Sequence, residues 1–138
     1  MTIKPFKIDD LGYFIPNQYS NPDDLLAQIP DPDFEVESLW YEGMVAAILL
    51  YTNYWGDCWR GCFLIAENFP PKLAIALREH IRATMIRKNA SRLHTESVSC
   101  AELTKWHEFL GFQYEGTREK MLHGRDYDMW AILRGALS

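Results

Sequence analysis

The stretch Cys100–Phe112, CAELTKWHEFLGF, contains the clearest structural signal in the chain. Its apolar residues recur at the spacing of one helix face: Leu103, Trp106 and Leu110. Gly111 then stands where helices commonly end in a left-handed residue, and Phe112 begins an extended segment. The stretch therefore predicts a short helix over residues 99–110 that ends abruptly and leads into strands.

The segments on both sides predict an alternation of strands and helices. Strands are expected at Thr2–Lys7, Phe34–Tyr41, Met44–Thr52, Cys58–Ala66, Leu93–Val98, Phe112–Arg118 and Tyr127–Leu133, the last two joined by a hairpin around Gly124. A longer helix from Pro71 to Asn89 has a buried stripe of Leu73, Leu77, Ile81 and Met85. The order predicts one α/β domain over residues 1–138, with a mixed sheet of about six to seven strands flanked by helices.

This order of elements, with the helix that ends in Gly111-Phe112, resembles the fold of the GCN5-related N-acetyltransferases (GNAT). That family commonly carries the pattern Asn-x-x-Ala-x-x-x-Tyr-x-x-x-Gly-Phe at this helix. Here Gly111 and Phe112 match, His107 stands in the place of the Tyr, and Cys100 stands in the place of the Asn. The resemblance implies a GNAT-like central sheet and, for an active member, acyl transfer from acetyl-CoA to an amine.

The resemblance also implies two candidate catalytic residues, and each has a plain structural alternative. His107 would replace the family's Tyr as the proton donor, because an imidazole titrates near neutral pH. The alternative is a half-exposed helix residue beside Trp106. Glu96 would share one face of its strand with His94 and act as the base, or else is an ordinary surface carboxylate. A hydrolase with Cys100 as the nucleophile is a weaker third interpretation, because no feature of the sequence indicates an activating environment.

The predicted cofactor segment departs from the family at its phosphate-binding loop. In the family, the pantetheine arm lies along the fourth strand and a glycine-rich loop holds the pyrophosphate with backbone N–H groups. The residues that would bind here are Phe63, Leu64, Ile65, Ala66, Asn68 and Lys72. However, the segment 66–72, AENFPPK, has no glycine, two prolines without an N–H and the anionic Glu67. We therefore expect acetyl-CoA binding to be weak or absent.

The charge is distributed unevenly along the chain. The net charge is −5, but residues 1–57 hold two basic and ten acidic residues, a net charge of −8, and residues 58–138 carry +3. An acidic chain is a poor candidate for nucleic-acid binding, although its basic part could attract a nucleotide phosphate. The acidic stretch Asp23–Glu37 would favour a cationic amine acceptor or would dock a protein partner.

The sequence contains no pattern for a metal site, a membrane span or a secretory signal. Three cysteines, Cys58, Cys62 and Cys100, and four histidines show no ligand spacing, so no metal is expected and the thiols are expected to be reduced. No apolar run approaches the ~20 residues of a membrane span. The segment MTIKPFKIDDLGYF lacks the apolar centre of a signal peptide, so we expect a cytoplasmic protein.

Two hypotheses about function follow from these observations. The first is a GNAT-like protein with a degenerate pyrophosphate loop that works through a protein partner. It resembles the small acyltransferase-like and internal virion proteins of short-tailed bacteriophages in its layout, which would place it in the host cytoplasm or in the virion. The alternative is an active acetyl-CoA-dependent N-acyltransferase whose acceptor is a lysine, a polyamine or a small amine.

Overall fold

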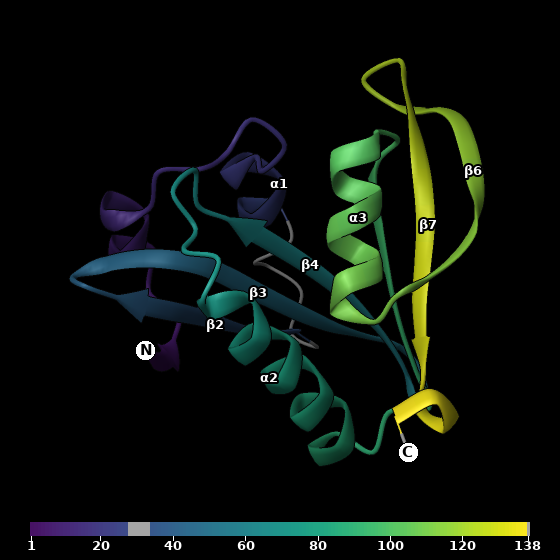
Figure 1. Ribbon diagram of the computed structural model, residues 1–138, viewed down its shortest axis with the longest axis horizontal. Coiled ribbons are helices and arrows are strands. Elements are labelled where there is room, and N and C mark those ends of the chain that lie inside the picture. The colour runs from purple at the N-terminus through teal and green to yellow at the C-terminus, as the bar shows by residue number, and fades with distance from the viewer. Residues whose placement is uncertain (28–33, 138) are drawn as a thin grey trace. The chain divides into compact units, whose positions relative to one another are not determined.

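The computed structural model describes residues 1–27 and 34–137. Its strands are β1 (Thr2–Pro5), β2 (Phe34–Tyr41), β3 (Met44–Trp55), β4 (Cys58–Ile65), β5 (Arg92–Val98), β6 (Gln113–Leu122) and β7 (Arg125–Leu133), and its α-helices are α1 (Pro22–Leu26), α2 (Leu73–Arg87) and α3 (Ala101–Leu110). Two 3₁₀ helices, η1 (Ile8–Tyr13) and η2 (Arg134–Leu137), complete the described elements (Figure 1). The strands form one seven-stranded mixed sheet in the order β1-β2-β3-β4-β5-β7-β6, which confirms the predicted fold class.

The chain divides into two compact units, which we describe separately. The N-terminal unit comprises Met1–Asn53 and Gly61–Leu73, and the C-terminal unit comprises Tyr54–Arg60 and Ala74–Ser138. The boundaries fall inside β3, β4 and α2, so these elements contribute residues to both units. The single domain predicted over residues 1–138 stays a prediction.

The N-terminal unit is built on the antiparallel strands β1, β2 and β3. A two-residue turn, Glu42-Gly43, joins β2 to β3 with positive φ at both positions, as a tight hairpin requires. The side chains of β3 are buried without interruption from Val45 to Tyr51, as predicted for a strand covered on both faces. Its core cluster consists of Phe14, Leu25, Val45, Ile48, Leu50 and Leu64.

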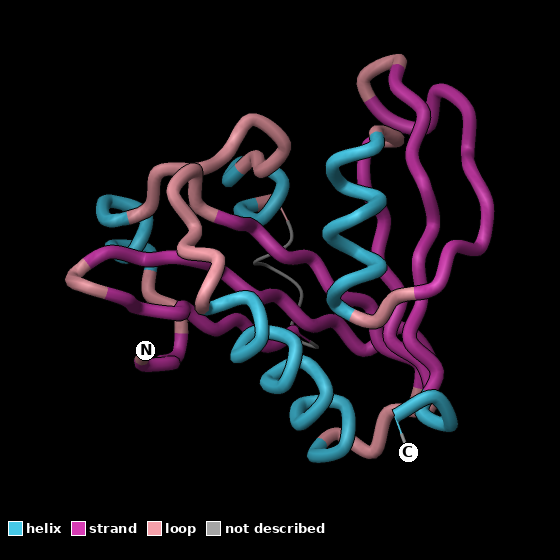
Figure 2. Tube along the Cα trace, viewed as in Figure 1, coloured by secondary structure: helices cyan, strands magenta, loops and turns pink. Residues whose placement is uncertain are grey.

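In the C-terminal unit β4 pairs with β5 in parallel, and β7 pairs with β5 and with β6 in antiparallel fashion; strands are magenta in Figure 2. The first residues of β4, Cys58–Arg60, pair in parallel with Arg92–His94 of β5. β7 then lies antiparallel between β5 and β6, and the predicted hairpin turns at His123-Gly124, where both residues have positive φ. Predicted strand ends were less accurate, since β3 continues past Thr52 to Trp55 and β6 continues past Arg118 to Leu122.

Helix α3 ends as its sequence predicts. Gly111 has φ +99, and the N–H groups of Gly111 and Phe112 donate to the carbonyls of Glu108 and His107 at 3.1 and 3.0 Å. A residue with a Cβ rarely adopts this backbone conformation, so the glycine lets the chain reverse into β6 within two residues. The helix end therefore determines where β6 begins.

Helix α2 buries the predicted stripe. Leu77 and Ile81 are fully buried, and Leu73 and Met85 are nearly so. The helix is shorter than predicted because it begins at Leu73 rather than at Pro71, and it ends two residues before Asn89, whose positive φ reverses the chain. Among the helices described, none is both long enough and apolar enough to cross a membrane.

Candidate functional site

The predicted cofactor segment at the end of β4 is largely used for packing in the N-terminal unit. Leu64 belongs to the buried core cluster, and Ala66 packs against that cluster. The ring of Phe63 lies edge-on to Tyr51, with centroids 5.6 Å apart. The N–H of Ile65 donates to the hydroxyl of Ser20 at 3.0 Å. Side chains and backbone of this segment therefore contact other parts of the same unit.

The loop after β4 offers few backbone donors to an anion. The N–H of Ala66 donates to the carbonyl of Ala46 at 2.9 Å, and that of Glu67 donates to the carbonyl of Ile15 at 2.8 Å. The N–H of Phe69 donates to the carbonyl of Ala66 at 3.2 Å. Pro70 and Pro71 have no N–H to give. Five of the seven residues from 66 to 72 thus have no uncommitted N–H with which to bind a pyrophosphate.

Lys72 and Asn68 remain as the polar side chains of the predicted set. Asn68 is exposed. The ammonium of Lys72 lies over the ring of Tyr41, 5.0 Å from its centroid, and a hydrogen bond with Tyr41 raises the pKa of Lys72. The lysine therefore keeps its positive charge but is positioned by a tyrosine rather than by a phosphate cradle.

His107 is a buried residue of the C-terminal unit, so the expectation of a half-exposed side chain was wrong. It is 7% exposed, its ring stacks on Trp130 with centroids 5.2 Å apart, and it lies edge-on to Phe112. Nδ1 lies 2.8 Å from the carbonyl oxygen of Leu103, so Nδ1 carries the proton and donates it. Burial lowers the pKa of His107, against the opposing effects of that bond and of Asp128. The imidazole is therefore neutral at neutral pH.

Glu96 is held in an ion pair on β5. Nε of Arg60 donates to both carboxylate oxygens, at 3.3 and 3.1 Å, and Nη2 lies 3.0 Å from Oε2. The Glu96 side chain is 14% exposed, against 31% for Arg60. The Glu96 carboxylate is therefore bound on both oxygens by the guanidinium of Arg60.

The two candidate catalytic residues lie on opposite faces of the sheet. Trp130 of β7 is paired with Thr95 of β5, and its indole N–H donates to the hydroxyl of Ser97 at 3.1 Å. His107 stacks on Trp130, so it lies on the face of Thr95 and Ser97. Glu96 alternates with these residues and points to the other face. The predicted acid and base therefore do not meet in this unit.

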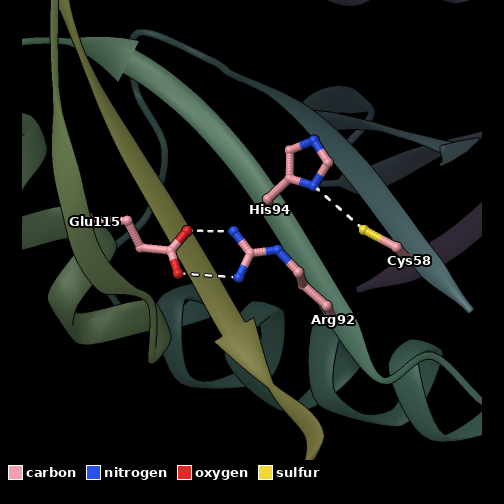
Figure 3. Close-up of polar contacts among 4 residues, drawn as sticks. All are labelled: Cys58, Arg92, His94 and Glu115. Carbon is pink, nitrogen blue, oxygen red and sulfur yellow. Dashed lines mark hydrogen bonds and ion pairs between the residues drawn. The ribbon is translucent and has the colours of Figure 1, made fainter. Parts of the chain in front are cut away.

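The face of β5 that carries Glu96 holds a polar group that no sequence motif marks as a site. Arg92, two strand positions before His94, donates through both terminal nitrogens to the two carboxylate oxygens of Glu115 on β6 (Figure 3). That pairing raises the pKa of Arg92 and lowers that of Glu115. Sγ of Cys58 lies 3.8 Å from Nδ1 of His94. The alternation of polar residues along Arg92–Glu96 was the available signal, but the partners come from distant strands.

The opposite face holds a second polar network, in which Asp128 is buried whereas Tyr114 and Thr117 are exposed. The hydroxyl of Thr117 donates to Oδ1 of Asp128 at 2.7 Å and lies 2.6 Å from the hydroxyl of Tyr114. The Tyr114 ring lies edge-on to Trp130, with centroids 5.6 Å apart. Asp128 is 6% exposed, so this network satisfies a buried carboxylate next to the His107–Trp130 stack.

Comparison with known proteins identifies the fold and leaves the family undefined. No protein-family model and no curated protein sequence matches the chain. Among solved structures, a mutant of spermidine N-acetyltransferase SpeG from Vibrio cholerae matches with a TM-score of 0.74 at 13% identity, covering 99% of this chain and 97% of that one. The ribosomal-protein-S18-alanine N-acetyltransferase from Escherichia coli matches with a TM-score of 0.75 at 19% identity, covering 96% and 92%. The chain therefore has the fold of the GCN5-related N-acetyltransferases.

Proposed function

We propose that this protein is a GNAT-fold acyltransferase-like protein whose pyrophosphate loop is degenerate, so that it binds acetyl-CoA weakly or not at all in the family's usual manner. The observation that supports the proposal is that most backbone N–H groups of the loop are already hydrogen-bonded or are missing. The N–H groups of Ala66, Glu67 and Phe69 already donate to carbonyls, and Pro70 and Pro71 have none. Phosphate binding at a loop and helix start depends on N–H groups that point outward, so the residues present do not fit a CoA pyrophosphate.

The charge of the loop supports the same proposal. Glu67 is exposed in this segment and would repel a phosphate. Lys72 would attract one only as a point charge, and its ammonium is positioned over Tyr41. A protein partner rather than a nucleotide thioester is then the expected ligand. The layout shared with small phage proteins, and with it a place in the host cytoplasm or the virion, stays a prediction.

Titration calorimetry with acetyl-CoA tests this proposal directly. We expect a dissociation constant of ~0.1 mM or weaker. A matched variant, Lys72→Ala, should bind no more weakly than the wild type, because its ammonium contacts Tyr41 instead of a phosphate. Micromolar affinity in the wild type, or a clear loss of affinity in Lys72→Ala, would overturn the proposal.

The second candidate function is N-acyl transfer to an amine, and the comparison of folds is what favours it. Both structures described above are N-acetyltransferases by name, one for spermidine and one for an alanine of ribosomal protein S18. A lysine, a polyamine or a small amine would be the acceptor, attracted by the acidic residues near the chain's N-terminus. Glu96 would then be the base, whereas His107 lies on the opposite face of the sheet with its Nδ1 proton donated to the Leu103 carbonyl and would not reach the same substrate as the acid.

An acetylation assay separates the two candidates. Purified protein is incubated with acetyl-CoA and a mixture of spermidine and a lysine-containing peptide, and release of the free thiol is followed. We expect no release above the rate of a heat-denatured control. Turnover that Glu96→Gln abolishes at an unchanged melting temperature would establish the second candidate instead.

A further inference from the structure

The structure brings a thiol and an imidazole together on the half-buried face of β5. The parallel pairing sets Cys58 of β4 beside Arg92 and Arg60 beside His94. Within this ladder, Sγ of Cys58 lies 3.8 Å from Nδ1 of His94, within reach of a hydrogen bond from sulfur (Figure 3). The hydrogen bond that positions His107 has no part in this contact, because His107 lies on the opposite face.

The tautomer of His94 sets which atom of this contact donates and which accepts. A thiol has one S–H to donate, and a neutral imidazole accepts at the nitrogen that carries no proton. Burial is the largest cause of a lowered pKa for His94, so the ring is neutral at neutral pH and its lone pair is available. With the proton on Nε2, Nδ1 faces the thiol and can take its proton.

The groups around this pair are charged, but their charges are matched. His94 is faced by the ring of Tyr54 from β3, at a centroid distance of 5.2 Å and edge-on. The charged groups that act on it are Arg60, Arg92, Glu96 and Glu115. They form two ion pairs, Arg60 with Glu96 and Arg92 with Glu115. The local net charge is therefore close to zero, and the thiol lies among charged groups that are paired with one another.

We propose that Cys58 is a nucleophile that accepts an acyl group from a small thioester, with His94 as its proton acceptor. Sγ of Cys58 bonds to the thioester carbonyl carbon as the carbon–sulfur bond of the donor breaks. The thiol proton passes to Nδ1 of His94 and then to the departing thiolate, which leaves as a free thiol. The product is an S-acylated Cys58. This proposal rests on the second candidate function, acyl transfer, only for its choice of an acyl group as the one transferred.

Two other cysteines of the chain serve as controls for the reactivity of Cys58. Cys58, Cys62 and Cys100 are all reduced and all of intermediate exposure. Cys62 packs against the core cluster of the N-terminal unit, and Cys100 precedes α3. A general increase in thiol reactivity would modify all three, whereas activation by His94 would single out Cys58.

The experiment uses the full chain and S-acetyl-N-acetylcysteamine, a thioester that carries no nucleotide. Acetylation of each cysteine is followed by peptide mass spectrometry. We expect Cys58 to be acetylated about a hundredfold or more faster than Cys62 and Cys100, the lower end of what a positioned base contributes. Cys58→Ser should remove this fast phase. His94→Phe keeps an aromatic ring against Tyr54 and should slow Cys58 to the rate of the other two cysteines, whose own rates stay unchanged.

Equal rates at the three cysteines, or an unchanged Cys58 rate in His94→Phe, would overturn the proposal. If His94→Phe does not fold, His94→Gln replaces it, since a glutamine side chain is neutral and cannot accept the proton at neutral pH. The probe has no phosphates, so its reaction does not depend on the loop at residues 66–72. Failure here is thus separate from the result of the acetyl-CoA titration.

Discussion

The histidines on the two faces of β5 have contrasting surroundings. On one face His107 is buried against Trp130, and Nδ1 of its ring donates to the Leu103 carbonyl of its own helix. On the other face His94 is half-buried, next to a thiol and between two ion pairs. Burial lowers the pKa of both residues. The difference teaches that the histidine singled out by the sequence pattern is surrounded by packed rings, whereas the histidine across the sheet has a thiol and two ion pairs beside it.

The largest loss of folding stability should come from a change at the centre of the sheet face that buries Trp130. Trp130 is 1% exposed and contacts His107, Tyr114 and Ser97. Trp130→Ala should lower the free energy of unfolding by ~3–5 kcal/mol, measured by urea denaturation, because it leaves a cavity and an unpaired hydroxyl. Met129→Ala, the adjacent residue on the opposite and less buried face, is the control. Equal losses in the two variants would remove the contrast between the faces.

The second largest loss of folding stability should come from a substitution at the end of α3. Gly111 has φ +99, and an added Cβ would meet nothing within 4 Å, so only the backbone conformation opposes a side chain there. Gly111→Ala should therefore lower the free energy of unfolding by ~1–2 kcal/mol. Gly12→Ala, where φ is not positive and space is also open, serves as the control. If Gly111→Ala leaves the free energy of unfolding unchanged, the helix end does not depend on the glycine.

His107→Phe tests whether the buried histidine is only packing. We expect the free energy of unfolding to change by no more than ~1 kcal/mol, the usual value of one hydrogen bond, and any acetyl transfer to be unaffected. If His107 were a general acid, turnover would instead fall by roughly 10²–10⁴ at an equal melting temperature.

The pH dependence of stability sharpens the same test. The pKa of His107 is lower in the folded state than in the unfolded state. As the pH falls through the ordinary histidine pKa near 6.5, the unfolded chain therefore binds more protons than the folded chain. The wild type should therefore lose stability between about pH 7 and pH 5, and His107→Phe should lose less over that range. Urea denaturation at each pH measures the free energy of unfolding. If this free energy changes with pH equally in His107→Phe and in the wild type, the burial of a neutral imidazole is contradicted.

The smallest effect should come from the ion pair on the half-buried face. The Arg92 and Glu115 side chains are 34% and 35% exposed, so solvent screens their attraction. A double-mutant cycle with Arg92→Met and Glu115→Gln should give a coupling of ~0.2–1 kcal/mol, less in added salt. A coupling several times larger would show that this face is more buried in solution than its exposure indicates.

Local sequence signals predicted most of the elements correctly. Alternation and apolar runs located both ends of β2 and placed β3 to within a few residues. The stripe through Leu77 and Ile81 predicted the buried face of α2. The ends of β3 and β6 were missed because edge and hairpin residues carry no strong propensity and are decided by pairing with a neighbour.

The candidate site was predicted less well than the fold. His107 was found because Gly111-Phe112 marks its helix, but its burial depends on Trp130, which is more than twenty positions away in the sequence. Cys58 and His94 show no ligand spacing and were therefore read as unrelated residues. Their contact arises only because β4 and β5 pair in parallel.

The sequence by itself determined the strand and helix periods, the glycine at the end of α3 and the prolines that remove N–H groups from the loop after β4. These are properties of single residues and of short-range spacing, which act before the chain is folded. The tertiary structure alone decided which carbonyls bind the remaining loop amides, which face of β5 holds each histidine and which thiol lies beside an imidazole. Those outcomes depend on strand register and burial, which join residues that no local pattern connects.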